Sequence, residues 1–122
     1  MARYLDKQAL QAKLNFGKEV EVFLGRDNED KNIISFLVLR KQNEKIGIYH
    51  YQCFDEGGLD YLDIYSFSEV EEKDTYQVLE LDSIEDAVEF IKTQYSLVEV
   101  RFVNQGVSQE EYKDLLQSEG VS

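Results

Sequence analysis

The segment that most restricts the fold is Ile33–Leu39, in which every residue except Ser35 is apolar. Successive side chains of a β-strand point to opposite faces of a sheet, so this run is apolar on both faces. A strand of that kind belongs in the middle of a sheet rather than at its edge. We therefore predict that the segment is a central strand.

Alternating patterns elsewhere in the chain predict further strands. Val20, Val22 and Leu24 alternate with their neighbours, as in a half-buried strand. Charged or glycine-containing turns, such as Asp55–Gly58, separate the alternating segments and favour an antiparallel meander. The expected strands are residues 20–24, 33–39, 45–54, 59–67, 75–81 and 97–103.

Three segments have the capping signals and apolar stripes of helices. The first begins at Asp6, and the other two follow Ser83 and Ser108, each of which is predicted to be an N-cap. The expected order is α-β-β-β-β-β-α-β-α. This order indicates one α+β domain over residues 1–122, with a mostly antiparallel sheet of five to six strands and three helices packed on one of its faces.

The net charge of −12 comes from one part of the chain. Residues 55–89 contain thirteen acidic side chains and a single basic one, Lys73. Such a concentration of negative charge argues against nucleic acid as a direct ligand and against binding to an anionic membrane. It favours a basic protein partner, or simply high solubility.

The residues typical of catalytic and metal sites are scarce. His50 and Cys53 are the only residues of their types, and on a strand they would point to opposite faces, so we expect both to be structural. The acidic turn 27–32 lacks the glycine and the distal glutamate of an EF-hand. We therefore predict no catalytic residue, no metal and no cofactor. A single cysteine and the lack of a long apolar stretch favour a soluble, cytoplasmic protein.

The candidate site combines acidic and aromatic side chains. Tyr61 and Tyr65 share a strand face with Asp63, and pairing with the preceding strand would join them to Tyr49 and Tyr51. The resulting patch would belong either to the core or to an exposed, protein-binding surface. The predicted partner-binding residues are Glu69, Glu71, Glu72, Asp74, Asp82, Glu85, Asp86, Glu89, Tyr61, Asp63 and Tyr65.

The function predicted from these features is that of a non-enzymatic inhibitor of a basic, nucleic-acid-acting protein. In size and charge the chain resembles bacterial toxin-immunity proteins and phage anti-defence proteins that imitate nucleic acid. Three alternatives remain open. The element order is also similar to that of type III secretion chaperones, an enzyme could use a cryptic site of tyrosines and carboxylates, and the partner could be unrelated to charge.

Overall fold

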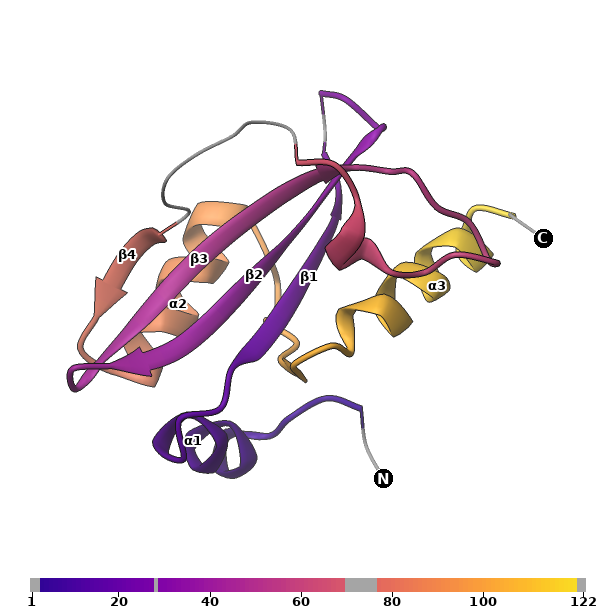
Figure 1. Cartoon of the computed structure of the whole chain (residues 1–122). Helices are drawn as coiled ribbons and strands as arrows, with labels where there is room; N and C mark the ends of the chain where they lie inside the picture. The colour runs from indigo at the N-terminus through magenta and orange to yellow at the C-terminus, as the bar shows by residue number, and fades with distance from the viewer. Residues whose placement is uncertain (1–2, 28, 70–76, 121–122) are drawn as a thin grey trace.

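A five-stranded antiparallel sheet forms the centre of the protein (Figure 1). The computed structural model describes residues 3–27, 29–69 and 77–120. The strands lie in the order β4-β3-β2-β1-β5. Strands β1 to β4, which follow one another in the chain, form a meander, and β2 is the middle strand of the sheet. The α+β class is confirmed. The strands are β1 (Val20–Arg26), β2 (Ile33–Gln42), β3 (Lys45–Phe54), β4 (Gln77–Leu81) and β5 (Val103–Asn104).

The β2–β3 hairpin is the longest pairing in the sheet. Its register runs from Ile33 opposite Phe54 to Gln42 opposite Lys45. The two turn residues, Asn43 and Glu44, both have positive φ angles, of 52° and 68°. Positive φ at both central positions matches the right-handed twist of the flanking strands, so this two-residue turn suits the hairpin.

Among the described residues, three α-helices and a short 3-10 helix pack around the sheet. They are α1 (Lys7–Asn15), η1 (Ile64–Ser66), α2 (Ile84–Tyr95) and α3 (Ser108–Ser118). The predicted caps at Asp6 and Ser83 are confirmed, because their side chains accept hydrogen bonds from the N–H groups three residues later, at 2.8 and 3.1 Å. These contacts hold the first turns of α1 and α2.

The predicted cap at Ser108 is wrong. The N-cap position of α3 is Val107, whose backbone is already helical, and Ser108 is the first residue of the helix. The helical turn starts early because the N–H of Glu110 bonds to the carbonyl of Val107. The Ser108 side chain is buried, and its backbone N–H donates to Glu21 at 3.4 Å.

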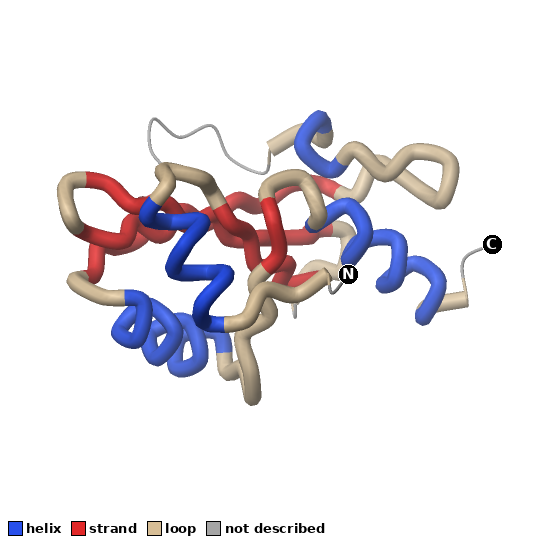
Figure 2. The backbone as a smooth tube through the Cα atoms, turned by 90° about the horizontal axis from the view of Figure 1, so that it is seen from below, coloured by secondary structure: helices blue, strands red, loops and turns tan. Residues whose placement is uncertain are grey.

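The helices cover both faces of the sheet, which corrects the expectation that they share one face. Alternate residues of β2 face opposite ways, so Leu37 packs with α1 and α2, whereas Phe36 packs with α3 and η1. Figure 2 shows the strands lying between α2 and η1. A central strand that is apolar on both sides needs cover on both sides, which explains the arrangement.

Two predicted strands are not formed as expected. Residues 59–67 fold as a loop and η1, because Gly58 and Tyr61 exchange two backbone hydrogen bonds in a tight turn. A side chain at Gly57 would meet the Tyr61 carbonyl at 2.3 Å, so glycine permits this close approach. β4 therefore pairs with β3 instead. Of the strand expected at 97–103, only Val103 lies in a strand, the two-residue β5.

Candidate functional site

The outer face of α2 is an acidic surface. Ala87 and Ile91 are buried against the sheet and therefore turn the opposite side of the helix towards solvent. Four carboxylates of the predicted site are exposed on or just before this helix. We call them the α2 acidic face: Asp82, Glu85, Asp86 and Glu89.

Two members of the α2 acidic face form exposed ion pairs within the chain. Lys7 lies 3.0 Å from Glu85, and Lys45 lies 3.3 Å from Asp82. The hydrogen bond from Lys7 holds the pKa of Glu85 below its ordinary value. Within residues 3–27, 29–69 and 77–120, no ion pair involves Asp86 or Glu89. These two carboxylates are thus the ones most open to a cationic partner.

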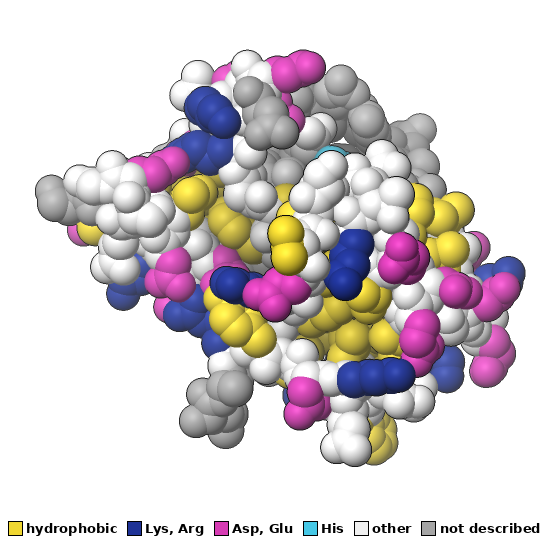
Figure 3. Space-filling model, turned by 180° about the vertical axis from the view of Figure 1, so that it is seen from behind, with side chains coloured by type: hydrophobic (Ala, Val, Ile, Leu, Met, Phe, Trp, Pro, Cys, Tyr) yellow, Lys and Arg dark blue, Asp and Glu magenta, His cyan; other side chains and the backbone are white. Residues whose placement is uncertain are grey.

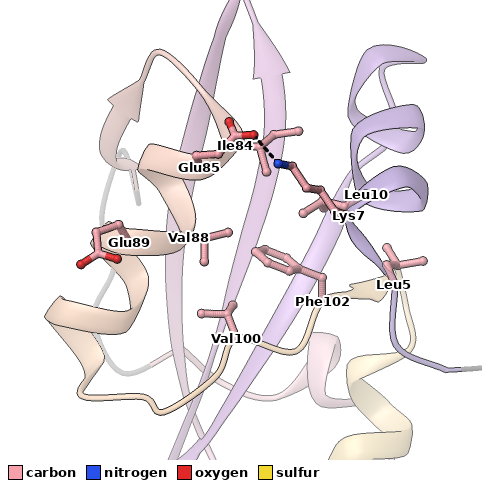
Figure 4. Close-up of a pocket in the computed structure, with 9 residues that line it drawn as sticks. All are labelled: Leu5, Lys7, Leu10, Ile84, Glu85, Val88, Glu89, Val100 and Phe102. Carbon is pink, nitrogen blue, oxygen red and sulfur yellow. Dashed lines mark ion pairs between the residues drawn. The ribbon is translucent and has the colours of Figure 1, made fainter.

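An apolar groove lies beside this acidic face, between α1 and α2 (Figure 4). It has a volume of about 380 Å³. Glu85 and Glu89 belong to its α2 side, and the ion pair of Lys7 with Glu85 spans its mouth. Figure 3 views the molecule from behind and shows hydrophobic surface bordered by side chains of both charges. The apolar lining consists of Leu5, Leu10, Ile84, Val88, Val100 and Phe102.

The tyrosine-rich part of the predicted site lies on the opposite face of the sheet. Tyr61 and Tyr65 belong to the segment around η1 and are 47% and 40% exposed. Asp63 and Glu69 accompany them there, and both are exposed. The structure therefore does not bring these four residues together with the α2 acidic face. Glu71, Glu72 and Asp74 lie outside the described residues.

The aromatic rings of this face nevertheless meet. The Tyr51 ring stacks on Phe36 with centroids 5.4 Å apart, and Tyr65 approaches Phe36 edge-on at the same distance. Tyr61 and Phe67 make a similar edge contact at 5.6 Å. The part of the predicted patch that forms does so through loop packing rather than strand pairing. It is partly core and partly surface, since Phe36 and Phe67 are buried.

A cavity of about 250 Å³, which we call the aromatic pocket, opens among these rings. Its aromatic lining is Phe36, Tyr51, Tyr65 and Phe67. Three carboxylates also line it, those of Glu19, Glu21 and Glu69.

Glu21 is a site residue that the sequence analysis missed. Because Glu21 alternates with Val20 and Val22, the sequence predicted only that it is a polar residue facing solvent. In the structure it is 2% exposed. The carboxylate accepts hydrogen bonds from the Tyr65 hydroxyl at 2.5 Å and from the N–H of Gly106 at 3.1 Å. Burial, followed by the bond to Glu21, raises the pKa of Tyr65, so this phenol stays protonated.

Asp55, at the start of the acid-rich segment, has a structural role instead. Its carboxylate lies 2.7 Å from Arg26 and accepts a hydrogen bond from Tyr112. Burial pushes its pKa upward, but the bonds from Tyr112 and Arg26 outweigh burial and hold the pKa below its ordinary value. Arg26 also pairs with Glu119 at 2.7 Å, so it joins β1, the end of β3 and the end of α3.

His50 and Cys53 lie on opposite faces of β3, as their spacing predicted. Cys53 is buried beside the Ile64 carbonyl, and burial raises the pKa of its thiol to about 11. The His50 ring contacts Tyr95 edge-on at 5.4 Å. Across the part of the chain that the structure describes, no cluster of acidic, histidine and cysteine side chains is suited to a metal ion. None of the described helices has the length and apolar character needed to cross a membrane.

Comparison of the chain with models of protein families, with curated proteins and with solved structures gave no match.

Proposed function

We propose that this chain is a non-enzymatic, acidic protein-binding domain that inhibits a basic, nucleic-acid-acting protein. The observation that carries the proposal is the position of the α2 acidic face beside an open apolar groove. Asp86 and Glu89 face solvent, and Glu89 borders the groove that Val88 lines. A basic segment with a bulky apolar residue would complement both features at once.

The two features contribute in different ways. Clustered carboxylates attract a basic surface over several ångströms and speed its association, an effect that salt weakens. The groove supplies apolar area that is removed from water on binding, which slows dissociation. A nucleic-acid-binding groove is lined with Lys and Arg to contact phosphates, so carboxylates presented by a rigid helix compete for it.

A toxin-immunity or phage anti-defence role is the specific form of this function that we propose. In either role, the chain would occupy the basic surface of an enzyme that acts on nucleic acid. The buried, protonated Cys53 thiol suits a reducing compartment, so we propose a cytoplasmic location.

The test begins with capture of the partner from its host and continues with binding kinetics on the purified pair. The variant D86K/E89K reverses the two carboxylates of the α2 acidic face that form no ion pair within the described residues. We expect it to slow association by tenfold or more at low salt. The matched control is E29K/E110K, which makes the same change in charge at exposed positions outside α2. Its association should change by less than about threefold, because long-range effects of net charge are screened.

Inhibition is tested on the same pair. The partner's binding to nucleic acid should fall when the original chain is added and should recover with D86K/E89K. Equal association rates for the two double variants, or binding that ignores salt, would contradict the proposal.

A further inference from the structure

The groove between α1 and α2 leaves apolar surface uncovered (Figure 4). Two of its lining residues, Leu10 and Phe102, are buried in the core. Leu5, Val88 and Val100 also line it but are only partly buried. An apolar group that fills the groove would remove this remaining surface from water and so gain free energy.

The charged side chains that line the groove favour a cation beside that apolar group. They are Lys7 on α1 and Glu85 and Glu89 on α2. Lys7 lies 3.0 Å from Glu85, so these two charges offset each other. Glu89 forms no ion pair with any residue that the structure describes, and it adds a negative charge to the α2 side of the groove. A ligand that carries a cation next to an apolar group matches both features.

The backbone around the groove argues against recognition by strand pairing. A peptide binds as an added strand where a sheet edge offers free N–H and C=O groups. The two sides of this groove are helices, whose interior backbone groups bond within the helix. Between them, the Phe102 carbonyl already accepts from the N–H of Leu5 at 2.8 Å. An amphipathic helix, which inserts side chains and needs no backbone partner, is the mode of peptide binding that suits such a groove.

We propose that the groove binds an amphipathic, basic helix of the partner protein. Bulky apolar side chains of that helix fill the groove, and a lysine or arginine on the same helix pairs with Glu89. Side chains three or four residues apart share one face of a helix, so an apolar residue and a cation at that spacing can contact the groove together. The volume of about 380 Å³ lies within the roughly 300–1,000 Å³ of ligand pockets, so it can hold bulky side chains. This inference rests on the function proposed above and adds the element by which the partner is recognised.

The probe is an acetylated and amidated alanine-based peptide of about 16 residues, a length at which alanine-rich sequences form helices in water. Two leucines and two lysines, each pair one turn apart, share one face of this leucine peptide. We expect it to cause saturable NMR shifts in α1, α2 and residues 97–102 at millimolar concentrations.

Two control peptides separate the apolar and the ionic contacts. A peptide with alanines in place of the leucines should bind at least about tenfold more weakly. An isomer with its lysines on the face opposite the leucines should bind about threefold more weakly. Binding of either control as tight as that of the leucine peptide, saturable shifts located elsewhere, or no saturable shifts would each overturn the proposal.

Variants of the chain locate the bound helix. Val100→Ser makes the lining of the groove more polar and should weaken binding of the leucine peptide about fivefold. Val98→Ser is the matched control, because it makes the same change at a position that is 96% exposed and outside the groove, and it should bind normally. Glu89→Gln should weaken binding about threefold. Because Glu89 is exposed, this variant tests the site even if Val100→Ser fails to fold.

The same measurements separate this inference from the proposed function. If the captured partner responds to D86K/E89K but Glu89→Gln and folded Val100→Ser bind the leucine peptide normally, the assignment of a helix to the groove is wrong and the proposed function stands. If association with the partner ignores salt while the peptides and variants behave as expected, the proposed function is wrong and the groove remains a site for a basic helix.

Discussion

The two faces of the sheet are packed by different kinds of side chain. The face covered by α1 and α2 is packed mainly by aliphatic side chains, such as Leu14, Leu37 and Ile48. The face covered by α3 and η1 is rich in aromatic rings. On the second face, the carboxylates of Glu21 and Asp55 also sit among tyrosines that donate to them.

This difference separates two sources of stability. Aliphatic packing gains free energy roughly in proportion to the area buried and needs no particular bond direction. A buried carboxylate stabilises the fold only while its donors are in place, and it becomes costly when one of them is removed. The first face should therefore respond mainly to changes in side-chain volume, and the second to the loss of single polar atoms.

The largest effect is expected on the aliphatic face. Ile48 is fully buried in the centre of β3, so Ile48→Ala should lower the free energy of unfolding by about 3 kcal/mol through lost burial and a new cavity. Urea denaturation would measure it. The matched control is Val98→Ala, at a position that is 96% exposed, where the change should be less than about 0.5 kcal/mol. A loss below about 1 kcal/mol for Ile48→Ala would mean that this face is loosely packed.

The next effect tests the polar network of the second face. Arg26→Met removes the cation from Asp55 and Glu119 while keeping much of the side-chain volume. We expect a loss of about 2 kcal/mol, less than for a fully buried pair because Glu119 is partly exposed. Arg101→Met, which removes the exposed pair with Glu99 and the contact of Arg101 with the Tyr4 ring, should lower the free energy of unfolding much less. Equal losses for the two variants would show that the network adds nothing beyond a surface pair.

A smaller effect, with a defined pH dependence, comes from the Tyr112 hydroxyl. Tyr112→Phe removes a donor to the ionised Asp55 and should cost about 1.5 kcal/mol at neutral pH. Because the folded pKa of Asp55 lies below its ordinary value, its contribution is fully present above that ordinary pKa and is lost as the pH falls through the folded pKa. The two unfolding free energies should therefore converge in acid. A difference that stays constant from neutral pH down to acid well below the ordinary carboxyl pKa would contradict this assignment.

The same contrast explains which parts of the molecule could be predicted. The strands β1 to β3 and the outward carboxylates of α2 follow from short-range periodicity, which is visible in any single segment. The positions of Glu21, Asp55 and η1 depend on contacts between residues far apart in the chain, such as Tyr65 with Glu21. The expected pairing of residues 59–67 with β3 failed because the turn at Gly57 and Gly58 folds that segment back on itself. For this reason the tyrosines and the α2 carboxylates, which were predicted as one surface, lie on opposite faces of the sheet.

The smallest expected effect compares two serines that have the same local sequence signal. Ser83→Ala should cost about 1 kcal/mol, because the N–H of Asp86 loses its acceptor at the start of α2. Ser108→Ala should cost less than half as much. Its backbone N–H still reaches Glu21, no capping bond is broken, and alanine favours the helix. Thermal denaturation of both variants measures the difference. If Ser108→Ala proves as costly as Ser83→Ala, the buried hydroxyl itself supports the contact between Glu21 and Tyr65, and the second face depends on single polar atoms even more than its hydrogen bonds indicate.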